Sequence, residues 1–192
     1  MEKYPGKKSI AVFISGRGSN LKSLIKYSKQ KKALYKIILV ISNNPDAKGL
    51  KYASKFRIKN YGIKYKNKSS FENQSLKLLK KNNVDILCLA GFMKILSKKF
   101  ITKFSSPILN IHPSLLPKYK GLKTHERAIK NNDKFAGASI HKVTEKLDSG
   151  KVILQKKVRI LKSDNVYSLK KKILKIEHKL YPKAVDIFLS KL

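Results

Sequence analysis

Residues 107–121 read Pro-Ile-Leu-Asn-Ile-His-Pro-Ser-Leu-Leu-Pro-Lys-Tyr-Lys-Gly, a short strand pattern that runs directly into prolines. Apolar and polar residues alternate from Ile108 to His112, and successive side chains of a strand point to opposite faces, so Asn110 and His112 share one face. The prolines cannot continue a central ladder, and the chain must leave the strand irregularly. Reacting groups of open α/β sheets gather at such strand ends. We therefore expect Asn110 and His112 at the carboxyl end of a strand.

Asn110 and His112 bring an amide and an imidazole to the same place. Both groups can donate a hydrogen bond to a carbonyl oxygen that gains negative charge, and the imidazole can also transfer a proton. The same two residue types can instead satisfy buried backbone groups at a strand end, and the spacing Asn-X-His alone favours that simpler interpretation. The choice between the two depends on the other segments of the chain.

Strand patterns alternate with helical patterns on both sides of this stretch. Strands are predicted at residues 9–14, 35–41, 61–65, 84–90, 108–112, 135–143 and 152–158. Helices are predicted after residue 20, after the turn at 42–46, after a Ser69 or Ser70 cap, after Ser97, over Thr124 to Lys130, and from Ser163 or Asp164 to an interruption at Pro182. This alternation predicts a single-domain, Rossmann-like α/β fold. Its sheet is mostly parallel and twisted, with helices on both faces and a C-terminal antiparallel strand and long helix.

A glycine-rich turn, Ser-Gly-Arg-Gly-Ser-Asn at 15–20, follows the first predicted strand and opens the first predicted helix. Such a turn points backbone N–H groups and a helix N-terminus at an anion, for which phosphate is the natural candidate. The turn lacks the third glycine of a dinucleotide fingerprint and the lysine of a P-loop, so neither cofactor is supported. The alternative is a tight turn with a Ser or Asn cap.

The formal net charge of +34 is the most unusual property of the composition. Only four of the 45 basic residues are Arg, and the lysines are spread over the whole chain, whereas specific nucleic-acid recognition favours Arg. We interpret the high lysine content as compositional drift under an A/T-rich codon bias, with the lysines placed on solvated faces. A positive field would still attract an anionic substrate.

The remaining composition indicates a globular protein without a metal site. The single cysteine, Cys88, lies in an apolar run and is expected to be a buried small hydrophobe, and the four histidines share no ligand-like spacing. The start of the chain has no signal-peptide pattern, and no apolar run approaches the roughly 20 residues of a membrane span. We expect a cytoplasmic protein.

Five segments together resemble the phosphoribosylglycinamide formyltransferase family of folate-dependent formyltransferases. They are Ser-Gly-Arg-Gly-Ser-Asn at 15–20, Leu-Ala-Gly-Phe-Met-Lys-Ile-Leu at 89–96, Asn-Ile-His-Pro-Ser-Leu-Leu-Pro at 110–117, Gly-Ala-Ser-Ile-His at 137–141 and Leu-Asp-Ser-Gly at 147–150. The match covers nearly the whole chain in the same order. The resemblance implies formyl transfer from 10-formyltetrahydrofolate to the amine of glycinamide ribonucleotide, in purine biosynthesis, with no metal.

The resemblance also implies roles for particular residues. Asn110 and His112 would stabilise the oxyanion, with His112 as the proton donor, and Asp148 would be the third catalytic residue. The substrate phosphate and ribonucleotide would contact Gly18, Ser19, Asn20 and Glu177. The folate would contact Met93, Lys94, Ile95, Leu96, Asn110, Thr144 and Asp148. Ser139 and His141 would support the catalytic residues without acting as catalysts themselves.

The sequence departs from the family at the folate site. Lys94 stands where many relatives have Arg, and residues 64–70 lack an Arg that some relatives place near the folate tail. These departures bear on folate affinity and not on the chemistry. The resemblance implies one formyltransferase domain over residues 1–192, with a phosphate-binding and nucleotide-binding half at about 9–105 and a catalytic, folate-contacting half at about 106–192.

Three other functions compete with this interpretation. Methionyl-tRNA formyltransferase and formyltetrahydrofolate deformylase share the segment at 110–117, but they resemble longer chains with an additional domain. A basic protein that binds nucleic acid without catalysis would need clustered Arg and stacking aromatic residues, which the sequence lacks. We expect small-molecule substrates, no nucleic acid, no membrane, and a monomer or weak homodimer.

Overall fold

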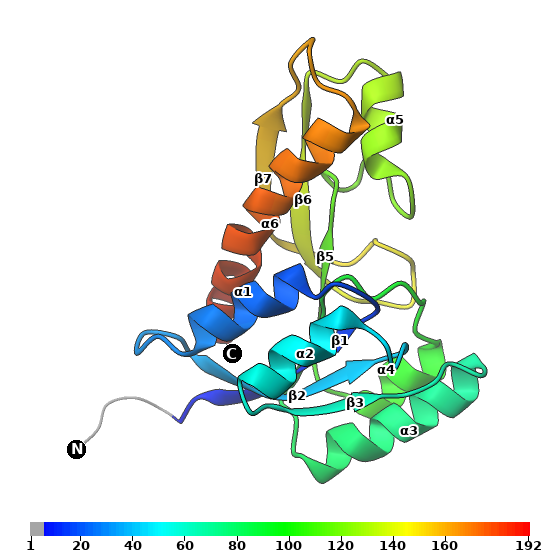
Figure 1. Cartoon of the computed structure of the whole chain (residues 1–192), viewed down its shortest axis with the longest axis vertical. Helices are drawn as coiled ribbons and strands as arrows, with labels where there is room; N and C mark the ends of the chain where they lie inside the picture. Colours follow the sequence, from blue (N-terminus) through cyan, green and yellow to red (C-terminus); the bar gives the residue numbers. More distant parts are fainter. Residues whose placement is uncertain (1–5) are drawn as a thin grey trace.

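The computed structural model describes residues 6–192, in which seven strands form one sheet in the order β3-β2-β1-β4-β5-β6-β7 (Figure 1). Residues 1–5 lie outside the described residues. The prediction that the chain start carries no signal peptide falls partly on them. The strands are β1 (Lys8–Ile14), β2 (Tyr35–Ser42), β3 (Lys59–Gly62), β4 (Ile86–Leu89), β5 (Ile108–His112), β6 (Phe135–Lys142) and β7 (Val152–Arg159). The helices are α1 (Ser19–Ser28), α2 (Lys48–Lys55), α3 (Lys68–Lys81), α4 (Lys98–Phe104), α5 (Thr124–Lys130) and α6 (Val166–Leu189). The predicted α/β class is confirmed.

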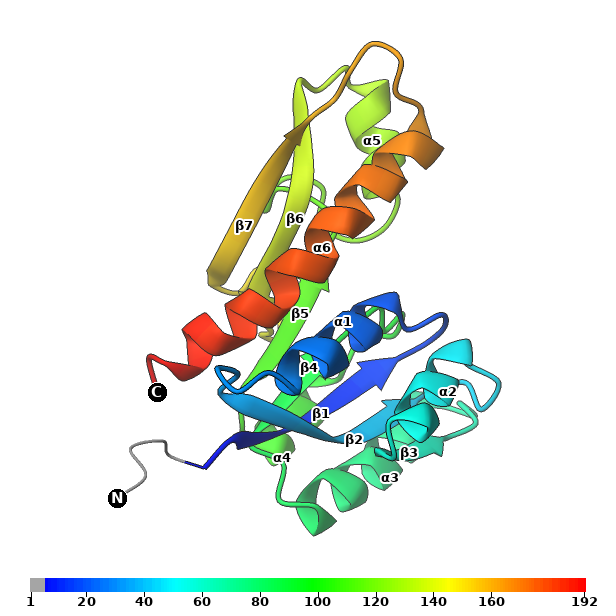
Figure 2. The ribbon, with the colours of Figure 1, turned by 60° about the vertical axis from the view of Figure 1, so that its left-hand side comes forward.

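The sheet changes direction at β6. Strands β3, β2, β1, β4 and β5 are parallel, whereas β6 is antiparallel to β5 and β7 is antiparallel to β6. Strands β6 and β7 extend away from the parallel part of the sheet, and α6 packs along them and runs back to α1 (Figure 2). In the β5–β6 register, Asn110 lies opposite His141 and His112 lies opposite Ser139. The reversal therefore adds polar side chains from β6 beside the two from β5.

Strand β1 separates two apolar cores. Ile10, Val12 and Ile14 belong to the core shared with α1, α2, α5 and α6, whereas Ala11 and Phe13 belong to the core shared with α3 and α4. Because both faces of the strand are covered, the strand reads as a continuous apolar run. The buried Cys88 on β4 belongs to the first core, and its burial raises the pKa of the thiol to about 12.

The structure corrects the position of β3, which ends at Gly62 and does not run from 61 to 65. A Cβ atom on Gly62 would lie 2.5 Å from the Cα atom of Pro45, so only glycine allows this close approach. The N–H of Ile63 still donates to the carbonyl of Ser42 at 2.8 Å, beyond the last residue of the strand. The tight packing against the β2–α2 turn thus sets the strand end.

Three helix starts differ from the prediction. Asn67 caps α3 in place of Ser69 or Ser70, Asn165 caps α6 in place of Ser163 or Asp164, and Gly18 precedes α1 without any side-chain cap. Both asparagine side chains accept a hydrogen bond from a backbone N–H in the first turn of their helix. Several neighbouring residues are chemically suitable caps, so the choice depends on the path of the incoming chain.

Helix α6 runs through Pro182 to Leu189, and the predicted interruption at Pro182 is wrong. A proline inside a helix costs about 3 kcal/mol. The helix face around it is buried, and this packing outweighs the cost. The hydroxyl of Tyr181, next to the proline, lies 3.1 Å from the carbonyl oxygen of Leu89 and 2.9 Å from that of Leu109. Helix α6 therefore holds the end of β4 and the first half of β5, next to Asn110.

Candidate active site

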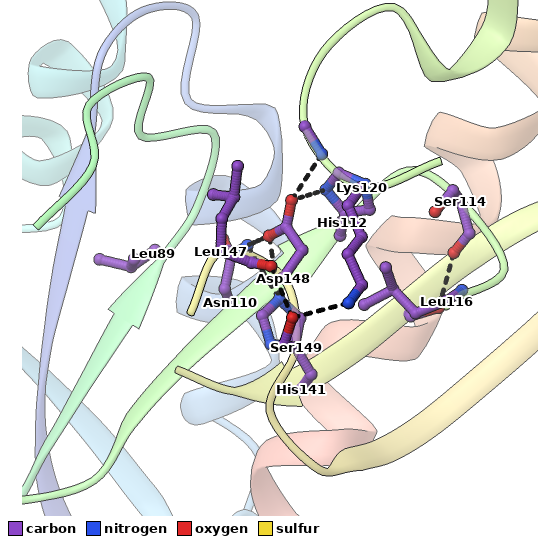
Figure 3. A network of polar contacts seen from close by, with 12 residues as sticks. Leu89, Asn110, His112, Ser114, Leu116, Lys120, His141, Leu147, Asp148 and Ser149 are labelled. Atoms are coloured by element: carbon purple, nitrogen blue, oxygen red, sulfur yellow. Dashed lines mark hydrogen bonds and ion pairs between the residues drawn. The ribbon is translucent and has the colours of Figure 1, made fainter. Parts of the chain in front are cut away.

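Asp148 stands at the centre of a buried polar cluster (Figure 3). Its Oδ2 atom lies 3.4 Å from Nδ1 of His112, and its Oδ1 atom lies 3.4 Å from Nε2 of His141 and 3.5 Å from Nδ2 of Asn110. Its Oδ2 atom also accepts the backbone N–H of Gly121 at 2.9 Å. One carboxylate therefore joins side chains from β5 and β6 with two surrounding loops.

The environment of Asp148 keeps its carboxyl group ionised. Burial alone raises its pKa, but the hydrogen bonds from His141 and Gly121 and the charges of His112 and His141 together lower it below the ordinary value. The side chain is therefore a carboxylate at neutral pH. It can accept protons or order a water molecule beside a reacting group.

The ring of His112 has an acceptor at each nitrogen. Its Nε2 atom lies 2.8 Å from the carbonyl oxygen of Tyr119, and its Nδ1 atom faces the carboxylate of Asp148. A carbonyl oxygen can only accept, so Nε2 carries a hydrogen. When Nδ1 is protonated as well, both N–H groups are satisfied. The side of the ring that faces Asp148 is therefore the side from which a proton can be delivered.

The neighbours of Asn110 engage one of the two N–H groups of its amide. Its Nδ2 atom lies 3.2 Å from Nε2 of His141, whose Nδ1 atom lies 3.0 Å from the carbonyl oxygen of Lys142. A carbonyl oxygen can only accept, so Nδ1 of His141 carries a hydrogen, and in the protonated ring Nε2 donates to Oδ1 of Asp148. One N–H of the Asn110 amide then faces Oδ1 of Asp148 at 3.5 Å, and the other remains available to a ligand. This arrangement suits the stabilisation of an oxyanion.

Ser139 supports the loop after β5, and among the described residues its hydroxyl makes no hydrogen bond to the cluster around Asp148. Its hydroxyl donates to the carbonyl of Ser114 at 2.6 Å and accepts from the N–H of Leu116 at 3.1 Å and from Nε2 of Gln155 at 2.7 Å. The residue is fully buried. It thus holds the Pro-Ser-Leu-Leu-Pro exit in place.

The glycine-rich turn has the conformation expected of an anion site. Gly18 has a φ of 71°, and a Cβ atom there would lie 2.6 Å from the Cα atom of Gly49, so the position requires glycine. Ser19 is the first residue of α1, and the N–H groups of this first turn have no partner within the helix. The turn therefore presents backbone donors at the carboxyl end of β1.

Asn20 and Glu177 form a buried pair between α1 and α6. Nδ2 of Asn20 donates to Oε2 of Glu177 at 2.7 Å, and Oδ1 of Asn20 is buried without a partner among the described residues. Burial raises the pKa of Glu177, and the hydrogen bond from Asn20 and the charge of Lys170 only partly oppose this effect. The structure thus joins two predicted substrate residues that lie 157 positions apart.

Apart from Asn110 on β5, the predicted folate residues lie on two segments. In the first, Met93 and Ile95 are exposed, Leu96 is buried in the second core, and Nζ of Lys94 lies 4.5 Å from the ring centre of Tyr65. In the second, Thr144 is exposed in the loop that carries Asp148. The side chain of Leu96 therefore faces the core, which leaves its backbone as the part that a ligand can reach.

Tyr119 and Gly121 contribute to the site, although their residue types do not single them out within residues 107–121. They act through backbone atoms, the carbonyl toward His112 and the N–H toward Asp148. Their positive φ values, 55° and 77°, turn the loop so that these atoms face the cluster. The one signal that could have found them is the glycine, which favours such a conformation.

Metal-binding clusters and membrane-spanning helices are both absent from residues 6–192. No group of three or more His, Cys, Asp or Glu side chains is arranged to hold a metal ion in this part of the chain. Among its helices, none combines the length and the apolar character required to cross a membrane.

Comparisons with known proteins show the family to which the chain belongs. The family model described as formyl transferase matches residues 8–185, and the chain belongs to this family. Among relatives, the phosphoribosylglycinamide formyltransferase of Escherichia coli is 38% identical over 183 residues, which cover 94% of this chain and 86% of the relative. That of Haemophilus influenzae is 40% identical over 188 residues, covering 94% and 87%.

Longer relatives and solved structures carry related names. The trifunctional purine biosynthetic protein adenosine-3 of Bos taurus is 40% identical over 190 residues, which cover 97% of this chain but only 19% of that protein. The chain therefore spans less than a fifth of the length of this relative. The structure of glycinamide ribonucleotide transformylase 1 from Symbiobacterium toebii superposes with a TM-score of 0.92 at 34% identity, covering 96% of this chain and 89% of that one.

Proposed function

We propose that the chain transfers a formyl group from 10-formyltetrahydrofolate to the amine of 5-phosphoribosylglycinamide. The products are formylglycinamide ribonucleotide and tetrahydrofolate, in the de novo synthesis of purines. The observation that carries the proposal is the cluster in which Asn110 and His112 both lie within 3.5 Å of Asp148, in a member of the formyl transferase family. The names of the bacterial relatives support the choice of acceptor.

The proposed reaction passes through a tetrahedral intermediate. The acceptor amine attacks the formyl carbon, and the carbonyl oxygen gains a negative charge that the free N–H of Asn110 and the Nδ1–H of His112 stabilise. The bond between the formyl carbon and N10 of the folate then breaks. The amine loses one proton and N10 gains one, and the Asp148 carboxylate with His112 provides the path between them.

The acceptor is proposed to bind along α1 and α6. Gly18 and Ser19 present backbone donors to its phosphate at the start of α1, where the helix dipole favours an anion. Glu177 would contact the ribonucleotide, and Asn20 would orient its carboxylate through their 2.7 Å hydrogen bond. The general positive charge of the protein would attract the same anionic substrate.

The formyl donor is proposed to lie between the two segments that flank Asn110. Met93 and Ile95 supply exposed apolar side chains for a flat ring, Lys94 supplies a charge, and Leu96 contributes through its backbone. Thr144 and Asp148 form the opposite side. In this arrangement, residues 9–105 bind the acceptor phosphate and form part of the donor site. Residues 106–192 provide the catalytic groups. We propose 10-formyltetrahydrofolate as the co-substrate, no metal, and a cytoplasmic monomer or weak homodimer.

The experiment that tests the proposal measures formyl transfer from 10-formyltetrahydrofolate to three acceptors in parallel. These are 5-phosphoribosylglycinamide, methionyl-tRNA and water alone. Turnover that requires the ribonucleotide is the expected result. Turnover only with the tRNA, or hydrolysis at the same rate without any acceptor, would overturn the acceptor assignment while keeping the chemistry at Asn110, His112 and Asp148. Absence of turnover in all three reactions would overturn the proposed function.

A further inference from the structure

The segment at 91–96, which we call the donor segment, follows β4 at the carboxyl edge of the sheet. The ring of Phe92 packs against Phe13 and Phe71, with ring centres 5.3 and 5.6 Å apart, and Leu96 is 8% exposed. Between them, Met93 and Ile95 are 69% and 59% exposed. The donor segment is therefore held by its apolar side chains at both ends and presents its middle to solvent.

Ser15 fixes the first end of the donor segment through its hydroxyl group. The backbone N–H of Met93 donates to Oγ of Ser15 at 2.8 Å, and the Ser15 hydroxyl donates to Oδ1 of Asn43 at 2.6 Å. Ser15 follows β1, Asn43 follows β2 and Met93 follows β4, and these three strands are neighbours in the sheet. A single hydroxyl thus connects three adjacent strand ends, and its donor and acceptor capacities are both used in these contacts.

Glu72 fixes the other end of the donor segment from α3. Its Oε1 atom accepts the N–H of Ser97 at 2.7 Å, and its Oε2 atom accepts the hydroxyl of Ser97 at 2.5 Å. Glu72 is only 6% exposed, and the Ser97 hydroxyl in turn caps α4 by accepting the N–H of Phe100 at 3.0 Å. A buried carboxylate committed to one serine holds that residue firmly.

We infer that Ser15 and Glu72 are positioning residues for the formyl donor, because they fix the backbone of the donor segment from its two ends. This inference rests on the proposed function. Ser15 lies in the glycine-rich turn assigned to the acceptor phosphate, yet its hydroxyl is committed to the donor segment. Substitution of Ser15 should therefore weaken the donor and spare the acceptor, which its place in the sequence would not predict.

The test uses steady-state kinetics of Ser15→Ala and Glu72→Ala with each substrate varied in turn. Each change leaves backbone groups unpaired and lets the donor segment move, so the KM for 10-formyltetrahydrofolate should rise about 10-fold. The KM for 5-phosphoribosylglycinamide should stay within about 2-fold, since the anion site is built from other groups. Binding of tetrahydrofolate, followed by titration calorimetry, should weaken in parallel.

Conservative and control variants separate positioning from general damage. Glu72→Gln keeps an acceptor for the Ser97 N–H and should restore most of the donor affinity, as should Ser15→Thr, which keeps the hydroxyl. Ser23→Ala is the matched control on α1, because the Ser23 hydroxyl bonds only to the carbonyl of Ser19 in its own helix, at 3.3 Å, among the described residues. It should leave both KM values unchanged, and thermal denaturation of every variant should show a folded protein.

The outcomes distinguish this inference from the proposed function. A rise in the acceptor KM with an unchanged donor KM in Ser15→Ala would overturn the inference, as would equal effects of Ser23→Ala or unchanged donor KM in both alanine variants. If the wild-type protein binds tetrahydrofolate but uses another acceptor, loss of tetrahydrofolate binding in both variants would still support the inference. A wild-type protein that binds no tetrahydrofolate would overturn both.

Discussion

Asp148 and Glu177 are two carboxyl groups with nearly the same exposure, 8% and 7%, but opposite behaviour. The pKa of Asp148 is lowered, because two histidines and a backbone N–H outweigh the effect of burial. The pKa of Glu177 is raised, because burial outweighs one amide donor and a lysine charge. Asp148 has more partners, and more charged ones, than Glu177, and Glu177 is more fully surrounded by protein atoms, so the two pKa values move in opposite directions.

The largest effect is expected from Asp148→Asn, which removes the charge around which the cluster is built. The variant keeps the size of the side chain but cannot accept a proton or favour a positively charged His112. We expect kcat to fall roughly 1,000-fold to 10,000-fold. Glu177→Gln, the same change at the other carboxyl group, is the matched control and should keep kcat within about 10-fold. Similar losses of kcat in both variants would contradict the comparison.

Asn110→Ala is expected to have the next largest effect. It removes one donor to the oxyanion and leaves the carboxylate in place, so kcat should fall roughly 100-fold to 1,000-fold with a modest change in KM. Steady-state kinetics at saturating concentrations of both substrates measure this effect. A near-normal kcat would exclude Asn110 from the mechanism, whatever the role of Asp148.

Glu177→Gln should affect binding and stability in opposite directions. Its new amide group can donate to Oδ1 of Asn20, which is buried without a partner among the described residues, so stability at neutral pH should rise by about 1 kcal/mol, or about 2–4 °C in Tm. Because the pKa of Glu177 is raised, the folded wild type takes up its proton before the unfolded chain and gains stability as the pH falls. This gain should be absent in the variant.

Glu177→Gln is also expected to weaken binding of the acceptor substrate. Loss of the Glu177 charge should raise the KM for 5-phosphoribosylglycinamide about 10-fold and leave the donor KM unchanged. Calorimetry of unfolding at several pH values and kinetics at one pH together check both effects. A lower Tm at neutral pH would show that the ionised carboxyl group stabilises the fold after all.

The smallest effect is expected from His141→Ala, which removes one hydrogen bond that lowers the pKa of Asp148. Asn110, His112 and the Gly121 N–H still face the carboxylate. The pKa of Asp148 should therefore rise, but only part of the way back to its ordinary value. In the proposed mechanism the active form is the carboxylate, so activity should be lost at a higher pH than in the wild type as the medium becomes more acidic. An unshifted acid limb of the kcat–pH profile would contradict this role.

The two carboxyl groups also differ in how far the sequence predicts them. Asn110, His112 and Asp148 lie in segments that resemble a known family, and the apolar–polar alternation along β5 by itself predicts that the first two share one face. The mostly parallel sheet likewise follows from the alternation of strands and helices. The predicted contacts of these residues with substrates remain predictions.

Other features depend on tertiary packing that local patterns do not carry. The continuation of α6 through Pro182 depends on a buried helix face, and the end of β3 depends on the close approach of Gly62 to Pro45. The bond between Asn20 and Glu177 connects distant parts of the chain, and on spacing alone Glu177 is one more helix residue. The backbone contacts of Tyr119 and Gly121 are independent of their side chains.

The hydrogen bond between Asn20 and Glu177 also bears on how the protein is made. Its two partners are separated by 157 residues, and ribosomes add about 5–20 residues per second, so Asn20 waits about 8–30 s before its partner is synthesised. During that interval the parallel strands can already pair, but the acidic member of this pair is missing. Vectorial synthesis therefore completes the proposed acceptor site last, after the proposed catalytic groups of β5 and of the Asp148 loop have already left the ribosome's active centre.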